Sequence, residues 1–203
     1  HVVSLSDRIK KEFIARGIDS TNVSVLPCGI DTDLYTLDET DVLYPDRSIV
    51  VGKIEPRKRQ AFLQHKDLNI DFIGNNTDSS FDELDPHYLG EQSKQDIMDN
   101  LTAYASMVLL SSGEAHPFVC LEGMAAGLGL VLSEQSTANL DISQPFITVI
   151  PDDKLDDTTY LNQKIKENRK ISLTMRSDIR KYCFDNFDWS SIIKQYKSII
   201  DSI

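Results

Sequence analysis

Two carboxylates stand eight positions apart in the middle of the chain, in the segment Glu114-Ala-His-Pro-Phe-Val-Cys-Leu-Glu122. The residues before Glu114 resemble a strand and those after it the start of a helix, so Glu122 is expected about one turn into that helix. A helix N-terminus presents unpaired N–H groups and the positive end of a dipole, which suit a phosphate. Flanking carboxylates can accept hydrogen bonds from sugar hydroxyls. The spacing therefore predicts a site for a nucleotide sugar.

A second group of charges follows an apolar run at 48–52. Lys53, Arg57, Lys58 and Arg59 place four cations within seven residues of an acidic chain. A diphosphate leaving group needs its charge neutralised as the bond to the sugar breaks, and preorganised charge is usually the largest catalytic term. Lys53 and Lys58 are placed to supply that charge at a strand-to-helix turn without a metal. A solvated basic helix start is the alternative, and the glutamate pair favours the functional interpretation.

Short apolar runs alternate with helical patterns along the chain, which predicts an α/β fold with a parallel sheet. Right-handed crossovers would make it a Rossmann-like, doubly wound sheet, with ligands at the carboxyl ends of the strands. Both charged segments fall at such ends. The predicted strands are 2–5, 23–26, 48–52, 69–74, 88–90, 107–110, 128–132 and 146–150, and the last three predicted helices are near 157–168, 172–184 and 189–202.

Composition narrows the class of protein. The chain has 203 residues, 40% of them hydrophobic, with 21 basic and 32 acidic side chains and a net charge of −11. A protein that coats nucleic acid usually shows a basic face, so no nucleic-acid partner is expected. Three distant cysteines, at 28, 120 and 183, favour reduced thiols over a disulfide framework. No apolar run reaches the ~18–20 residues of a membrane span.

Several segments, in order, resemble the donor-binding half of the retaining GT-B glycosyltransferases of glycosyltransferase family 4. Residues 25–31 are similar to the family's P-N-G-V-D loop, and 51–58 to its V-G-R-L-x-x-x-K turn. Residues 88–90 resemble its nucleobase strand, and 111–127 its E-x7-E motif followed by A-M-A-A-G. Residues 187–190 resemble the start of its closing helix, so the similarity spans nearly the whole chain.

The resemblance implies a role for each matching residue. Glu114 would contact the transferred sugar and Glu122 the ribose hydroxyls, while Lys53 and Lys58 clamp the diphosphate. Backbone N–H groups near the start of the helix that follows Glu114 would face the sugar and diphosphate. The backbone at the end of the segment 88–90 would meet the nucleobase. These further donor-binding positions are His116, Pro117, Phe118, Val119, Gly52, Gly90 and Glu91. Neither a metal nor a cofactor is expected, because the nucleotide sugar is itself the substrate.

The resemblance also implies what lies outside this segment. The 203 residues would form one Rossmann-like nucleotide-sugar-binding domain, and an N-terminal domain of the same parent chain would supply the acceptor site. We therefore expect the isolated segment to bind donor without transferring sugar. The parent would be a cytoplasmic hexosyltransferase-like enzyme. Its acceptor is not indicated by these residues.

Some positions depart from the family's pattern. Ala115 and Pro117 stand where glycines are common, and Lys53 stands where arginine is usual. A lysine keeps the charge and loses the bidentate fork of a guanidinium. A non-catalytic nucleotide-binding or assembly module of the same architecture is therefore the main alternative, and a GT-B sugar epimerase is a third.

Structural explanations compete with the functional ones at single residues. Glu114 can simply stabilise a helix N-terminus, and Glu122 can be a surface glutamate. His116 is expected either to position neighbouring groups or simply to be exposed. Cys120 is expected to pack in the interior, because no base is visible to activate its thiol. The apolar stripe of the last helix, which begins at Trp189, is expected to lie partly in solvent or against a neighbour.

Overall fold

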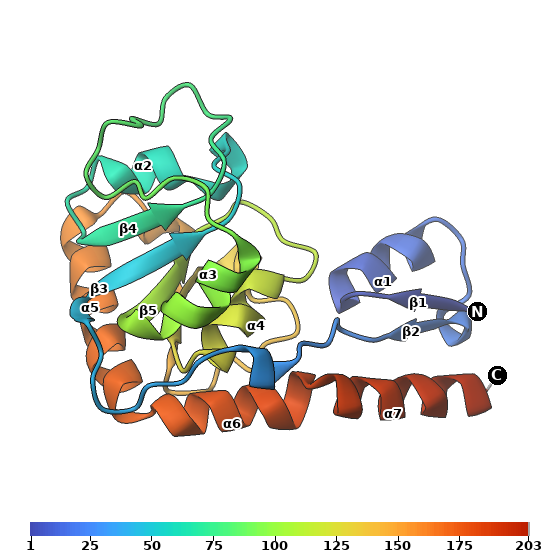
Figure 1. Cartoon of the computed structure of the whole chain (residues 1–203). Helices are drawn as coiled ribbons and strands as arrows, with labels where there is room; N and C mark the ends of the chain where they lie inside the picture. The colour runs from blue at the N-terminus through green and yellow to red at the C-terminus, as the bar shows by residue number, and fades with distance from the viewer. Residues whose placement is uncertain (203) are drawn as a thin grey trace.

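The computed structural model describes residues 1–202 and places most of them around one five-stranded sheet (Figure 1). Its strand order is β4–β3–β5–β6–β7, and every neighbouring pair is parallel. The α/β, Rossmann-like sheet expected from the alternation of elements is confirmed. Its strands are β3 (Tyr44–Val51), β4 (Ile70–Ile73), β5 (Tyr104–Leu109), β6 (Gly129–Ser133) and β7 (Ile147–Ile150).

Helices cover both faces of this sheet, as a parallel sheet requires. One face packs against α3 (Lys94–Asn100), α4 (Phe118–Ala125) and α6 (Arg176–Phe187), whose core positions include Met98, Met124 and Ile179. The other face packs against α2 (Gln60–Gln64) and the first half of α5 (Thr158–Thr174). All residues of β5 and β6 are buried, so these central strands have no solvent-facing side.

The first residues form a separate parallel pair of strands. β1 (Val2–Ser4) pairs with β2 (Val23–Val25), and α1 (Asp7–Ala15) connects them. The connection to the sheet domain passes the start of α7 (Trp189–Asp201), where Ile30 N–H donates to Phe187 O and Trp189 N–H donates to Ile30 O. Both chain ends lie on this side of the molecule (Figure 1). The proposed single domain over 1–203 stays a prediction.

The final helix carries the exposed apolar face that its stripe predicted. Ile192 is buried, whereas about half of each of Trp189, Ile193, Tyr196 and Ile200 is exposed. The expectation of a partly solvent-exposed stripe is therefore confirmed.

Several predicted boundaries were wrong. Residues 88–90 do not form a strand but a single bridge between Phe72 and Tyr88 beside the edge of β4. β3 begins at Tyr44, four residues before the predicted apolar run. This start was missed because the first residues of the strand are mostly exposed and do not continue the apolar run. The helix break falls at Met175 rather than at 169–171. Short 3-10 turns complete the chain, at Ser20–Asn22, Thr32–Leu34, Pro56–Lys58, Leu101–Ala103, Glu134–Ser136 and Asp152–Lys154.

Candidate functional site

Three loops meet at the carboxyl ends of β3, β4 and β5, where the sequence placed the candidate site. The loop after β3 touches the loop after β5, because Ser112 N–H donates to Arg57 O at 2.8 Å. The backbone of the loop after β4 also lies against that of the loop after β3. A Cβ added to Gly74, whose φ is +148°, would collide with the carbonyl oxygen of Gly52. Glycine is needed at Gly74 for both its backbone conformation and this close approach.

Glu114 lies in the loop after β5 and is held by an arginine. Arg57 Nη1 lies 3.0 Å from Glu114 Oε1, and the glutamate side chain is only 14% exposed. The same guanidinium donates to Glu55 Oε1, to Ser111 Oγ and to the carbonyl oxygen of Gly113. Glu114 is therefore oriented by a charged partner that is itself fixed on several sides. The sequence showed a basic cluster, but no pattern in it singled out Arg57.

Glu122 lies inside α4, one turn beyond its start, and faces the core side of the site. Tyr35 donates its hydroxyl hydrogen to Glu122 Oε1 at 3.0 Å. Burial raises the pKa of Glu122, while the hydrogen bond from Tyr35 opposes that rise. The suggestion that Glu122 is a plain surface residue is wrong. Tyr35 was missed because it lies in a segment without helical or strand periodicity.

Lys58 lies on the same side of the sheet as the tip of α4. Its Nζ would stand 2.8 Å from a Cβ added to Gly52, so this glycine leaves room for the ammonium. The charges of Glu114, Lys58 and Glu122 all act on the buried thiol of Cys120 in the first turn of α4. Burial is the main cause that raises the pKa of this thiol, in agreement with a packing role. The hydrogen bond from Ser112 N–H to Arg57 O places the loop that carries Lys58 against the loop that leads into α4.

Lys53 is exposed and lies at a neighbouring cavity of about 420 Å³. Gly52, Glu91, Gly74 and Asn75 also line this cavity. Gly90 lies next to it, because its carbonyl oxygen accepts from Gly74 N–H at 2.9 Å. Lys53, Glu91 and Gly90 therefore gather at the ends of β3 and β4, beside the groups around Glu114.

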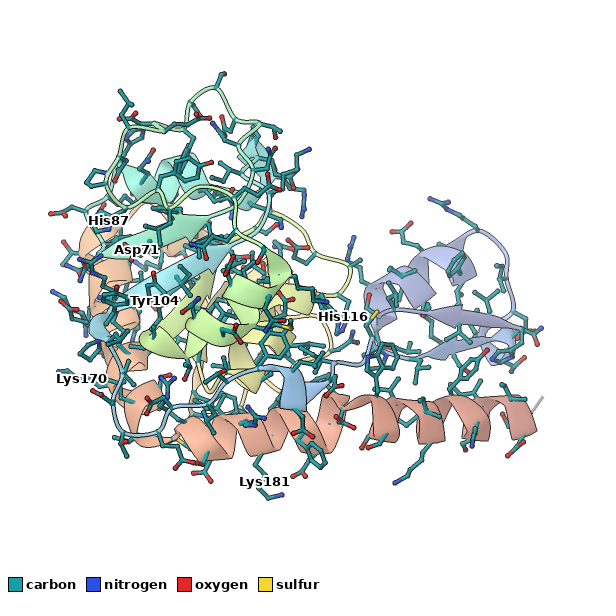
Figure 2. The ribbon with its side chains drawn as sticks, in the orientation of Figure 1. Asp71, His87, Tyr104, His116, Lys170 and Lys181 are labelled. Atoms are coloured by element: carbon teal, nitrogen blue, oxygen red, sulfur yellow. The ribbon has the colours of Figure 1, made fainter. Side chains whose placement is uncertain are left out.

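His116 is largely buried, so the suggestion that it might be exposed is wrong. Asn139 Nδ2 donates to His116 Nδ1 at 3.0 Å, which leaves the hydrogen of the neutral ring on Nε2. Nε2 is sealed from solvent and has no hydrogen-bond partner among residues 1–202. Burial lowers the pKa of His116. Figure 2 shows its position between the sheet and the N-terminal strands.

The start of α4 offers fewer backbone donors than the sequence suggested. Pro117 has no N–H, and Phe118 N–H already donates to His116 O at 2.9 Å. The N–H of Val119 makes no loop hydrogen bond in the described residues 1–202. Val119 therefore keeps a main-chain donor available in the first turn of α4, as do Ala115 and His116 in the loop before it.

The Rossmann-like fold matches one half of solved GT-B glycosyltransferase structures. No family model matches the chain, and no curated protein matches it. Among solved structures, the Anabaena protein HepE in complex with UDP and glucose superposes with a TM-score of 0.76 at 18% identity. The match covers 99% of this chain and 63% of HepE.

Two further solved structures show the same architecture. The lipopolysaccharide outer core galactosyltransferase WaaB has a TM-score of 0.76 at 17% identity, over 98% of this chain and 61% of WaaB. A sucrose-phosphate synthase from Thermosynechococcus elongatus has a TM-score of 0.74 at 14% identity, over 99% and 58% of the two chains. At these identities the similarity establishes the fold. The chain spans about three fifths of each of these structures.

Within the described part of the chain, none of the helices has the length and apolar content needed to cross a bilayer. Residues 1–202 also contain no cluster of three or more metal-ligating His, Cys, Asp or Glu side chains.

Proposed function

We propose that this chain binds a nucleotide-diphosphate sugar and that, in its parent protein, it transfers the sugar to an acceptor with retention of configuration. The observation that carries the proposal is the arrangement at the tip of α4. Two glutamates, Glu114 and Glu122, bracket the helix start, and Lys58 belongs to the loop that contacts the segment leading into this helix. The structural relatives HepE and WaaB, whose names state UDP binding and galactosyl transfer, support the same class of ligand.

The two carboxylates are suited to two different parts of the donor. Glu114 lies in an open loop and its carboxylate is fixed by Arg57, which suits a directed hydrogen bond to a sugar hydroxyl. Glu122 lies deeper and shares its carboxylate with Tyr35, which suits a pair of ribose hydroxyls. Hydrogen bonds to a charged group contribute about 1.5–3 kcal/mol each, so the contact of Glu114 with the sugar would distinguish a nucleotide sugar from a free nucleotide, whereas the Glu122 contact would be common to both.

Lys58, Lys53 and the positive end of α4 would stabilise the leaving group. When the bond between the anomeric carbon and the diphosphate breaks, its electron pair passes to the diphosphate oxygen. Cations already in place stabilise that charge without reorganisation. With retention, the acceptor oxygen forms its bond to the anomeric carbon on the face the diphosphate leaves. The acceptor's proton passes to the departing diphosphate, which lies on the same face.

A non-catalytic nucleotide-binding module is the second candidate, and the turn before α4 favours it. Pro117 removes one backbone donor and Phe118 uses another within the turn. A module of this kind would bind a nucleoside diphosphate as tightly as its sugar conjugate. A GT-B enzyme should discriminate between them through Glu114.

Two experiments test the proposal. The first is a thermal-shift screen of the chain against UDP-, GDP- and ADP-sugars, because a ligand at 100 times its Kd stabilises the folded state by about 2.7 kcal/mol. The second is Glu114→Ala in the full-length parent, which should abolish turnover while leaving nucleoside diphosphate binding in place. Absence of stabilisation by every nucleotide sugar would contradict the proposal. Unchanged turnover in the variant would assign Glu114 a structural role instead.

A further inference from the structure

A cavity of about 490 Å³ lies at the amino ends of β3 and β4, the opposite end of these strands from the candidate donor site. Asp67, Leu68 and Asn69 line it just before β4 begins, and Asp46 lines it at the start of β3. The remaining wall is formed by α5. Figure 2 labels Lys170 on this side of the molecule, far from His116.

One face of α5 gives this cavity its positive charge. The helix contributes Asn162, Lys166, Arg169, Lys170 and Leu173, which follow the spacing of a single helical face. Three of these five side chains are cations, in a chain whose net charge is −11. Among residues 1–202 neither lysine forms an ion pair. Asp46 and Asp67 also line the cavity, so its cations exceed its carboxylates by one.

Arg169 is held firmly in this wall by hydrogen bonds. Its side chain is fixed, because Nε donates to Ser48 Oγ at 2.9 Å and Nη2 donates to the carbonyl oxygens of Leu68 and Asn69 at 2.8 and 2.7 Å. The residue is only 4% exposed, and no carboxylate lies within ion-pair distance among residues 1–202. Burial lowers the pKa of Arg169 to about 10, with Asp46 acting in the opposite direction.

The third nitrogen of Arg169, Nη1, makes no hydrogen bond in the described chain. Nη1 is not sealed from solvent. Because Arg169 lines the cavity, Nη1 is the guanidinium nitrogen that is available there. Arg176, on the next helix, behaves differently. Its three nitrogens all donate to protein oxygens, from Asp38, Tyr104, Thr102 and Ala126. Arg176 is satisfied by the fold, whereas Arg169 has a donor left for a ligand.

We propose that this cavity is a second ligand site, which binds a phosphomonoester of a small polyhydroxy molecule such as a sugar phosphate. Arg169 and the two lysines match a dianionic group with several acceptor oxygens. The cavity has room for more than a phosphate group, which suits a ligand with an organic part. Asn162 and Asp67 can hydrogen-bond hydroxyl groups, whereas Asn69 Nδ2 already donates to Asp46. This site is independent of the donor site at the other end of the strands.

The test is isothermal titration of the chain with glucose 6-phosphate, inorganic phosphate and glucose, at fixed ionic strength and with excess UDP to occupy the donor site. We expect saturable binding of glucose 6-phosphate, weaker binding of inorganic phosphate, and none of glucose. The double variant Lys166→Ala/Lys170→Ala should weaken binding about tenfold or more, as for charge pairs that contribute about 1.4 kcal/mol. Lys194→Ala/Lys197→Ala, on the exposed surface of α7, removes the same two charges as a matched control and should bind normally.

Arg169→Lys is a second variant, which keeps the charge and loses the fork. If it unfolds, the double lysine variant still decides, because Lys166 and Lys170 make no ion pairs in the described chain. Absence of saturable binding by all three probes would overturn the proposal. So would binding that survives the double variant but is lost in Lys58→Ala, because the ligand would then occupy the donor site. Equal affinity for inorganic phosphate would overturn the polyhydroxy part of the ligand.

Discussion

Arg57 and Glu114 come from loops after different strands and meet with 3.0 Å between Nη1 and Oε1. The pair is uneven in exposure, because the arginine is 44% exposed and the glutamate 14%. A partly buried carboxylate that is paired with a more solvated guanidinium has a fixed direction. The ion pair therefore determines how the Glu114 carboxylate is presented to a ligand at the tip of α4.

Arg57→Ala should weaken binding of a nucleotide sugar more than binding of the matching nucleoside diphosphate. Without the guanidinium, Glu114 loses its orientation, and the sugar loses a directed contact. We expect about a tenfold loss for the sugar conjugate, or about 1.4 kcal/mol, and less than about threefold for the diphosphate. Paired calorimetric titrations measure both. Arg16→Ala, which removes an exposed partner of Glu12, is the charge-matched control. Equal losses for the two ligands would show that Arg57 acts on the phosphates.

Glu122→Gln should separate stability from binding. Burial raises the pKa of Glu122 in the folded chain, so its stabilising contribution is complete below the ordinary value of 4.5 and is lost as pH rises through the folded pKa. At neutral pH the glutamine variant should therefore unfold at a higher temperature, and this advantage should vanish in acid. Thermal melts across this pH range measure the difference.

The same Glu122→Gln variant should bind a nucleoside diphosphate about tenfold more weakly, because a charged acceptor for the ribose is lost. The corresponding 2′-deoxynucleotide should lose less, since it offers one hydroxyl fewer. If both nucleotides weaken equally, Glu122 does not contact the ribose.

His116 should make the fold sensitive to mild acid. Burial lowers its pKa below the ordinary 6.5, so the unfolded chain takes up the proton first as pH falls. The contribution of His116 is therefore present above pH 6.5 and is lost as pH falls through the folded pKa. Urea unfolding of the wild type at several pH values should show this fall, and His116→Gln should reduce it. An identical pH dependence in the variant would place the titrating group elsewhere.

Gly29→Ala should disturb the junction with α7. A Cβ at this position would stand 2.6 Å from Trp189 Cδ2, so the indole must move. Trp189 is the single tryptophan of the chain, which makes its fluorescence a direct report. We expect a red shift of the emission and a loss of about 1–3 kcal/mol in unfolding free energy, as for other overpacked sites. Gly113→Ala, which meets open space, is the control. An unchanged spectrum would contradict the packing of Trp189 on Gly29.

The sequence predicted the elements whose residues carry a strong local signal. β5 and β6 are fully buried runs, and α4 begins where Pro117 ends the preceding loop. The predicted strand at 88–90 was wrong. The single bridge at Tyr88 depends on the neighbouring backbone of β4 rather than on the local sequence pattern. The predicted break near 169–171 was wrong because Arg169 hydrogen-bonds β3 and the loop before β4, so α5 continues through it.

At the candidate site, the spacing from strand ends was enough to propose both glutamates and Lys58, and their roles stay predictions. It could not reveal Arg57 as the partner of Glu114, since three neighbouring cations are equally suitable by type. Tyr35 was also out of reach, because its contact with Glu122 spans 87 positions of the chain. Contacts of this kind depend on tertiary packing and have no signal in local periodicity.

The central proposal is that the tip of α4 and Lys58 hold the diphosphate of a nucleotide sugar, while Glu114 and Glu122 accept hydrogen bonds from its sugar and ribose hydroxyls. The most direct measurement is a calorimetric titration of the chain and of Lys58→Met with the nucleotide sugar that stabilises the chain most. Lys197→Met, on exposed α7, serves as the control with the same change of charge. The account predicts saturable binding by wild type and control, and about a tenfold or greater loss in Lys58→Met. Equal affinity in all three proteins would contradict it.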